Sequence, residues 1–245
     1  MKYSVLTLFP EITDAFFANS IMAKAIKRGI IEYQVINIRD FAQDKHKTCD
    51  DAPYGGGPGM LMLAEPLSKA LETVLGEKKR VIYLTPSGQS FNQEMAKELA
   101  AEKELVLICG RYEGIDQRII DKYVDDEISI GDYVLSSGEV AALAIIDATY
   151  RLVDEVIRSD SLDEESFSSG LLEYPQFTRP EVFDTMKVPE VLLSGHHEQI
   201  RLWRLEKRVE KTLRLRPDLI QRGRELELFN KEINGIIDRI IRRER

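Results

Sequence analysis

Four glycine-bearing loops hold the residues of this sequence that could do chemistry. They are "YGGGPGM" (54–60), "LTPSGQ" (84–89), "CGRYEGIDQR" (109–118) and "IGDYVLSSGE" (130–139). Glycines occur where a backbone takes unusual angles or comes close to a ligand. None of the four matches the G-x-G-x-x-G fingerprint or the G-x-x-x-x-G-K phosphate loop. The glycine content of these loops therefore indicates that they bind a ligand and are not plain surface turns. It does not identify the ligand.

The sequence has few features of a metal site or of a serine hydrolase. His46 and the pair His196-His197 stand in no H-x-x-x-H or H-E-x-x-H motif. Cys49 and Cys109 are far apart and neither has a second cysteine nearby, which argues against a disulfide or zinc framework. No G-x-S-x-G motif points to a serine hydrolase.

Alternating strand and helix signals must position these loops. Short segments rich in β-branched and aromatic residues predict strands at 3–8, 32–38, 80–84 and 104–109. Helical patterns lie between them, including 92–102, for which Asn92 is the expected N-cap. This alternation predicts an α/β fold with a largely parallel sheet. Two of the glycine loops follow strands, at the carboxyl edge where open α/β sheets bind ligands.

The second half of the chain changes character. Residues 139–153 are apolar on most sides and predict a buried helix. The acidic, serine-rich stretch 158–170 reads as a linker, and 171–245 is helical. Pro217 should end one helix or begin the next. Four basic residues fall on one helix face at helical spacing: Arg201, Arg204, Arg208 and Lys211.

Composition fits an ordinary globular protein. The chain has 245 residues, of which 43% are hydrophobic and 31% charged. It has no apolar run of membrane-spanning length and no secretory signal, so we expect a cytoplasmic protein. A net charge of −8 argues weakly against a nucleic-acid partner. However, residues 1–170 carry 18 basic and 29 acidic residues, and 171–245 carry 16 and 13. This asymmetry indicates either an anionic partner for the C-terminal part or a solvated helix face.

The four loops resemble those of the bacterial tRNA (guanine-N1)-methyltransferase family, which modifies guanine 37, just 3′ of the anticodon. The matching stretches run in order along nearly the whole chain. They are "LFPE", "DDAPYGGGPGM", "CGRYEGIDQR", "EISIGDYVLSSGE", "SFSSGLLEYPQFTRPEVF" and "VPEVLLSGHHEQIRLWR".

The resemblance implies a division of the chain into three parts. Residues 1–157 would form a trefoil-knotted α/β methyltransferase domain, although knots are rare in general. Residues 158–170 would be an interdomain linker, and 171–245 a small all-α, tRNA-binding domain. The resemblance further implies a homodimer in which one subunit's linker covers the other's cofactor loops.

The resemblance also assigns a cofactor, S-adenosylmethionine, wrapped by loop backbone. The implied cofactor-binding residues are Tyr83, Leu84, Pro86, Gly110, Tyr112, Glu113, Gly114, Ile130, Gly131, Asp132, Tyr133, Val134, Leu135, Ser137 and Gly138. Ser137 stands where the family usually has a glycine, so its Cβ would weaken cofactor binding if φ is positive there. Members of the family use magnesium, which makes Mg²⁺ a possible second cofactor without a fixed site.

Catalytic and tRNA-contacting residues follow from the same match. Glu113, Arg151 and Glu165 are the implied catalytic residues. Glu165 replaces the family's aspartate, and Asp163 and Glu164 remain alternatives for the general base that removes the guanine N1 proton. Arg151 would stabilise charge developing toward guanine O6. The implied tRNA contacts are Asp50, Gly59, Arg111, Ser166, Arg201, Arg204, Arg208 and Lys211.

Two other functions compete with this reading. One is a knotted methyltransferase that acts on another RNA base, against which the full-length match argues. The other is a tRNA-binding protein without catalysis, in which the cofactor loop has decayed. Mapping the methylated nucleotide separates the first from our reading, and calorimetry with S-adenosylmethionine separates the second.

Overall fold

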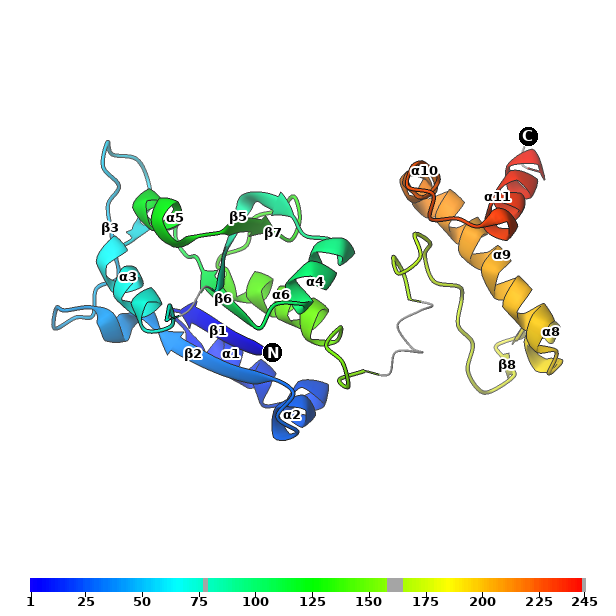
Figure 1. Cartoon of the computed structure of the whole chain (residues 1–245), viewed down its shortest axis with the longest axis horizontal. Helices are drawn as coiled ribbons and strands as arrows, with labels where there is room; N and C mark the ends of the chain where they lie inside the picture. Colours follow the sequence, from blue (N-terminus) through cyan, green and yellow to red (C-terminus); the bar gives the residue numbers. More distant parts are fainter. Residues whose placement is uncertain (77–78, 158–164, 244–245) are drawn as a thin grey trace. The chain divides into compact units, whose positions relative to one another are not determined.

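A computed structural model describes residues 1–76, 79–157 and 165–243 (Figure 1). The chain forms two compact units, Met1–Ile157 and Arg158–Arg245. We call them unit 1 and unit 2 and describe each by itself. Within the described residues, no helix is long and apolar enough to cross a membrane.

Unit 1 is built on a parallel sheet of five strands, which confirms the predicted α/β fold. The strand order is β2-β1-β6-β5-β7, and every pairing is parallel. The strands are β1 (Lys2–Thr7), β2 (Glu32–Asn37), β5 (Arg80–Ser90), β6 (Glu104–Cys109) and β7 (Asp126–Ser129). Strands β1 and β6 lie inside the sheet, and all but the first residue of each is buried, as expected for a sheet covered on both faces.

Helices cover both faces of the sheet. Successive strand residues point to opposite faces, so Val5 belongs to one hydrophobic core and Leu6 to the other. The first core packs against α1 (Pro10–Phe17), α2 (Ser20–Lys27), α4 (Gln93–Ala100) and α6 (Glu139–Tyr150). The second packs against α3 (Ala64–Glu72), α5 (Gln117–Tyr123) and the 3-10 helix η1 (Ile38–Phe41). Two short strands, β3 (Asp50–Asp51) and β4 (Leu61–Met62), pair outside the sheet.

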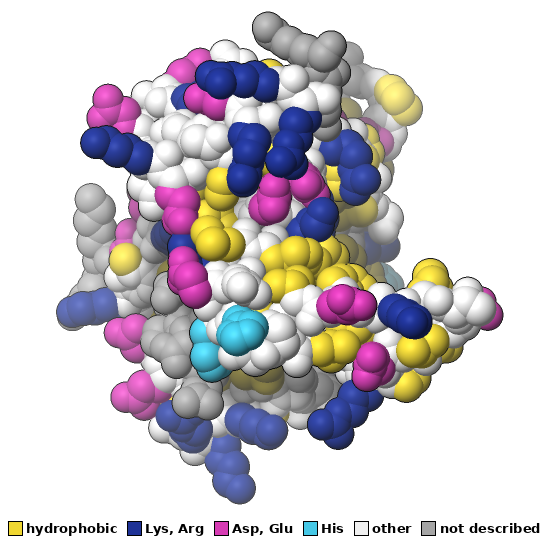
Figure 2. Space-filling model, turned by 90° about the vertical axis from the view of Figure 1, so that its right-hand side faces the viewer, with side chains coloured by type: hydrophobic (Ala, Val, Ile, Leu, Met, Phe, Trp, Pro, Cys, Tyr) yellow, Lys and Arg dark blue, Asp and Glu magenta, His cyan; other side chains and the backbone are white. Residues whose placement is uncertain are grey.

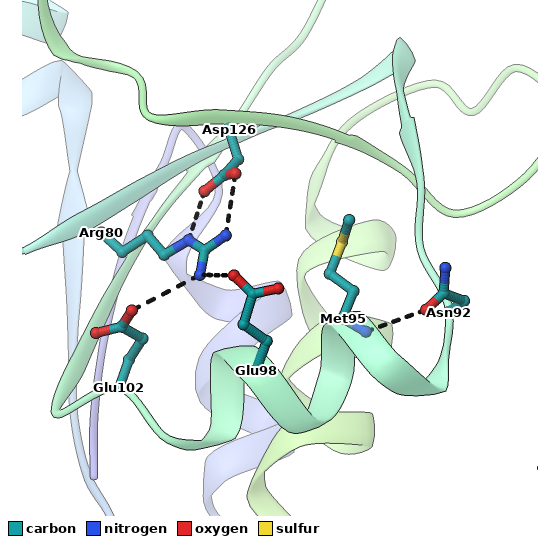
Figure 3. Close-up of polar contacts among 6 residues, drawn as sticks. All are labelled: Arg80, Asn92, Met95, Glu98, Glu102 and Asp126. Carbon is teal, nitrogen blue, oxygen red and sulfur yellow. Dashed lines mark hydrogen bonds and ion pairs between the residues drawn. The ribbon is translucent and has the colours of Figure 1, made fainter. Parts of the chain in front are cut away.

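Several predicted elements are confirmed at or near their predicted limits. Asn92 caps α4, since its side chain accepts hydrogen bonds from the backbone of Glu94 and Met95, both at 3.0 Å. Figure 3 shows the bond from Met95. Helix α6 is buried on most sides but ends at Tyr150, three residues before the predicted limit. Strand β5 continues past the predicted residue 84 to Ser90, with a register shift against β7 between Leu84 and Gln89.

An ion-pair cluster joins β5, β7 and α4 at the end of the sheet opposite the glycine loops (Figure 3). Arg80, the first residue of β5, donates from Nε to Asp126 Oδ2 at 2.6 Å and from Nη2 to Oδ1 at 3.1 Å. Its Nη1 donates to Glu98 at 2.7 Å. Because Asp126 begins β7, this bidentate contact holds the edge strand in its place beside β5.

Unit 2 is mainly helical, with α8 (Glu190–Leu193), α9 (His197–Leu215), α10 (Pro217–Glu225) and α11 (Lys231–Arg243). Of the two alternatives predicted for Pro217, the structure shows that it begins a helix. The expectation of an all-α unit is wrong in one detail, because β8 (Val182–Phe183) and β9 (Met186–Lys187) form a short antiparallel hairpin. A small core holds α9, α10 and α11 together. It consists of Leu171, Val209, Ile220, Phe229, Ile236, Ile237 and Ile240.

Candidate active site

The loop 130–138 crosses directly over the carboxyl end of β6. The backbone N–H of Gly138 donates to the carbonyl of Gly110 at 2.8 Å, and Arg111 and Ser137 form an antiparallel bridge. A Cβ on Gly138 would lie 2.8 Å from the Cα of Cys109, closer than side chains come to backbone. The sequence therefore needs glycine at position 138 for two chain segments to pass each other here.

These segments enclose a cavity of about 260 Å³ at the carboxyl edge of the sheet. Of the fifteen expected cofactor residues, fourteen line it, and Asp132 does not. The lining residues that the sequence reading did not include are Thr85, Ile128, Ser129, Ser136 and Ala141, together with Arg111, which was expected to contact tRNA. The structure thus brings the 83–86, 110–114 and 128–138 segments together around one space.

Ser129 lines the cavity, and its position in the sequence could have identified it as a residue that shapes the turn. Its hydroxyl donates to the carbonyl of Gly131 at 3.0 Å and accepts from the backbone N–H of Gly131 at 3.2 Å. A serine at the end of a strand, two residues before a glycine, is a common way to shape such a turn. Gly131 itself has φ of +152°, in the region that favours glycine.

Aromatic rings line the cavity next to the glycines. A Cβ on Gly110 would lie 2.8 Å from the ring of Tyr83, so the absence of a side chain lets the ring close that wall. Burial raises the pKa of Tyr83. Partial burial and then the neighbouring Asp50 carboxylate raise the pKa of Tyr112. Both phenols therefore stay protonated and can serve as neutral hydrogen-bond donors at neutral pH.

The glycine-rich 54–60 loop supports the 111–116 loop from outside. The backbone N–H of Glu113 donates to the carbonyl of Met60 at 3.0 Å, and that of Met62 donates to Gly114 at 2.9 Å. A Cβ on Gly59 would collide with the Glu113 side chain. Two expected tRNA-contacting residues, Asp50 and Gly59, therefore lie beside the cavity residues Tyr112 and Glu113.

A buried hydrogen-bond chain connects the "LFPE" segment to the same site. Thr7 Oγ1 donates to Glu139 Oε1 at 2.5 Å and accepts from the backbone N–H of Phe9 at 2.9 Å. Glu139, the first residue of α6, is only 1% exposed. The ring of Phe9 in turn carries the guanidinium of Arg111, with 4.3 Å from Cζ to the ring centroid. Phe9 thus holds Arg111 in the wall of the cavity.

The remaining catalytic candidates lie in different places. Arg151 is the C-cap residue of α6 in unit 1. Glu165 and Ser166 are described with unit 2, where Ser166 Oγ accepts from the backbone N–H of Glu173 at 3.0 Å. The alternative bases Asp163 and Glu164, and residues 158–164 of the expected linker, lie outside the described residues.

The predicted basic face of α9 is not one solvated surface. Arg208 is 9% exposed and donates to the carbonyl of Leu172 at 3.2 Å and to Ser169 Oγ at 2.7 Å. Arg201 is ion-paired with Glu198 at 2.8 Å and Glu232 at 2.7 Å. Arg208 does not lie on a solvated face, because it shares a helix turn with buried Val209 and satisfies polar groups inside the unit. Its contact with tRNA stays a prediction. Figure 2 shows Lys and Arg side chains interspersed with acidic ones.

No group of three or more His, Cys, Asp or Glu side chains that could hold a metal ion occurs in the described part of the chain. Cys49 and Cys109 are both buried free thiols. Burial, followed by the charge of Glu139, raises the pKa of Cys109, which keeps this thiol protonated and unreactive. The site therefore consists of loop backbone, three tyrosines and a few charged side chains.

A cavity at the carboxyl edge of a parallel sheet, walled by the backbone of crossing loops, defines an α/β protein with a small-molecule site. The chain belongs to the tRNA (guanine-1)-methyltransferase TrmD family, whose family model matches residues 1–222. This confirms the family resemblance seen in the loops.

Proteins of Treponema and Borreliella are among the similar relatives, and each is named a tRNA (guanine-N(1)-)-methyltransferase. The relative from Treponema denticola is 65% identical over 237 residues, covering 97% of this chain and 98% of its own. That from Treponema pallidum is 60% identical, covering 97% and 95%. That from Borreliella burgdorferi is 62% identical over 221 residues, covering 89% and 92%.

Proposed function

We propose that this enzyme transfers a methyl group from S-adenosylmethionine to N1 of guanine 37, the guanine 3′ of the anticodon in tRNA. Family membership supports the reaction type and the tRNA substrate. The observation that carries the proposal is the cavity, which fourteen of the fifteen expected cofactor residues line together.

The residues present fit the cofactor. Loop backbone at 110–114 and 130–138 offers N–H and C=O groups to an adenine edge, and Gly110 and Gly138 leave room that a Cβ would fill. Ser137, which replaces a usual glycine, is not among the residues with positive φ, so its side chain introduces no backbone strain. S-adenosylmethionine, when bound, supplies a methyl group activated by its sulfonium.

The protein's part in the reaction is to position the base and move one proton. Guanine N1 carries a proton at neutral pH and must lose it to attack a methyl group. A carboxylate is a suitable general base, and Glu165 is our first candidate, with Asp163 and Glu164 as alternatives. Arg151 would stabilise the negative charge that develops toward O6, and Arg111, which lines the cavity, would assist it. No step is assigned to magnesium, since the described residues offer it no cluster of ligands.

The proposal includes the architecture that the resemblance implies. Residues 1–157 would form the knotted domain, which the close crossing of loop 130–138 over Gly110 supports. Residues 158–170 would be the linker and 171–245 the tRNA-binding domain. The enzyme would work as a cytoplasmic homodimer, in which the linker of one subunit brings Glu165 to the cavity of its partner.

Methyl transfer to tRNA transcripts tests this function. A transcript with guanine 3′ of the anticodon should accept one methyl group, and the same transcript with adenine there should accept none. Nuclease mapping of the product should locate 1-methylguanine at that nucleotide. Methylation at a different nucleotide would replace our proposal with a knotted methyltransferase of other specificity. Binding of tRNA without any transfer would favour the non-catalytic alternative.

A further inference from the structure

Unit 2 contains a cavity of its own, separate in the chain from the cofactor loops. Its volume is about 610 Å³. The segment 174–181 forms one wall, and side chains from α8 and α9 form the other. Val188, Leu192 and Ile200 give it an apolar floor. Such a cavity suits a flat, mostly apolar group.

Two aromatic rings, those of Phe177 and Trp203, form part of the lining of this cavity. The centroids of Phe177 and Trp203 lie 6.3 Å apart, and the ring planes are tilted by 53°. Because the rings are tilted rather than stacked, they do not cover each other's faces. Phe177 is 47% exposed, which leaves ring surface open to a ligand. Stacking of an unpaired nucleobase on such a ring strengthens binding by roughly five- to 150-fold per base.

The charges around the cavity favour an anion. Its lining holds two arginines, Arg179 and Arg204, and a single acid, Glu181. Arg204 lies over the ring of Tyr174, with 4.8 Å from Cζ to the centroid, so its planar face extends the aromatic surface. Arg179 is exposed and forms no ion pair within residues 165–243, whereas Arg201 on α9 is already paired with two glutamates.

We propose that this cavity binds one unpaired nucleobase of the tRNA, stacked on Trp203 and Phe177, with the adjacent phosphate on Arg179. The inference rests on the proposed function, because it takes tRNA as the polyanion that unit 2 meets. Rings and an exposed arginine side by side are the chemistry that recognises single-stranded loops of RNA.

A second copy of this chain is the competing occupant. The hairpin β8–β9 exposes Phe183 and Met186, which are 68% and 64% exposed, and apolar groups of this kind also serve protein interfaces. Neither residue lines the cavity. Phe183 therefore provides a matched control: an exposed phenylalanine near the proposed site that should not contribute to base stacking.

Trp203 is the only tryptophan of the chain, so its fluorescence reports on this cavity directly. Adding an unmodified tRNA transcript should quench the fluorescence with a saturable curve. Phe177→Ala should raise the Kd for the transcript about tenfold, since it removes one stacking surface. Phe177→Tyr should restore binding to within twofold. Arg179→Ala should raise Kd and reduce the slope of log K against log salt by about one.

The controls separate this inference from the proposed function and from misfolding. Phe183→Ala should leave Kd unchanged, and all variants should keep the S-adenosylmethionine-dependent rise in Tm. If wild type methylates the transcript while Phe177→Ala binds it as tightly as wild type, the inference is wrong and the function stands. If wild-type fluorescence responds to protein concentration and not to RNA, the cavity belongs to a dimer interface and the inference is overturned. Quenching of the fluorescence by the transcript without methyl transfer would contradict the proposed function but not the inference about this cavity.

Discussion

Arg80 and Asp126 face each other across the start of two neighbouring strands, joined by two hydrogen bonds of 2.6 and 3.1 Å (Figure 3). Hydrogen bonding to Asp126 raises the pKa of Arg80, so this guanidinium stays charged. Arg80 is the first residue of β5, and Asp126 is the first of β7. The pair therefore fixes the edge strand that leads into the cofactor loop.

Replacing Arg80 should destabilise unit 1 more than the loss of a typical side chain near the surface does. Arg80→Ala leaves the mostly buried Asp126 carboxylate without its partner, and we expect a loss of about 2 kcal/mol in the free energy of unfolding. Urea denaturation at pH 7 measures this loss. Arg28→Ala, which removes an exposed ion pair with Glu155, is the matched control and should cost less than about 1 kcal/mol. Equal losses in the two variants would refute the role assigned to Arg80.

Gly138→Ala tests the crossing of loop 130–138 over β6. The added Cβ meets the backbone of Cys109 at 2.8 Å, and backbone cannot move aside as a side-chain tip can. We expect the variant to lose most of the rise in stability that S-adenosylmethionine gives, which is about 2.7 kcal/mol at a hundredfold excess over Kd. Gly235→Ala in α11, where the new Cβ meets open space, should keep the full shift. An unchanged shift in folded Gly138→Ala would place the cofactor elsewhere.

Acid stability should depend on Glu104. Burial alone would raise the pKa of this carboxyl, but the Ser4 hydroxyl and the ammonium groups of Lys79 and Lys2 outweigh burial and lower it. A lowered pKa in the folded state stabilises the protein above the ordinary glutamate pKa of about 4.3, and this contribution is lost as pH falls through the folded-state pKa. Glu104→Gln should therefore lower stability at pH 7 and flatten its decline between about pH 5 and pH 3. Parallel pH profiles for wild type and variant would contradict this.

Removal of Arg208 and removal of Lys211, both in α9, should have different effects on stability and on tRNA binding. Arg208→Ala leaves the carbonyl of Leu172 and the hydroxyl of Ser169 without a buried donor, so it should cost about 2 kcal/mol of unit 2 stability. Lys211→Ala should leave stability within about 0.5 kcal/mol of wild type. If Lys211 contacts a tRNA phosphate, its removal should reduce the salt slope of binding by about one. Thermal unfolding and filter binding at several salt concentrations measure the two effects.

Subunit exchange tests whether Glu165 acts in its partner's site. Gly131→Val forces a branched side chain onto a backbone with φ of +152°, and Glu165→Ala removes the candidate base. Each homodimer should be inactive. A mixed dimer would hold one intact site, and random mixing should restore activity to about a quarter of wild type. Mixed dimers verified by mass spectrometry but without activity would mean that each site is built within one chain.

Much of unit 1 could be predicted because its strands are short apolar runs and its loops keep family motifs. Strand β7 was missed because "DEIS" begins with two acids, and its place depends on Arg80, more than forty residues earlier in the chain. Helix α5 was missed although Asp116 accepts a hydrogen bond from the Arg118 backbone as its N-cap, since the motif there was read as a loop. Arg208 was misplaced because helical spacing alone does not reveal which part of a basic stripe packs inward.

The buried contacts of β1 also constrain when the site can form during synthesis. Thr7 bonds to Glu139, 132 residues later, and Tyr3 bonds to Thr149 at 2.8 Å, 146 residues later. In the sheet, β1 pairs on one side with β2, which is synthesised soon after it. On its other side β1 pairs with β6, which is synthesised much later. Contacts this distant in sequence slow folding and leave a nascent chain with an unpaired, apolar edge. The cavity cannot close until α6 has left the ribosome, so the cofactor can stabilise only the finished unit and cannot guide its early folding.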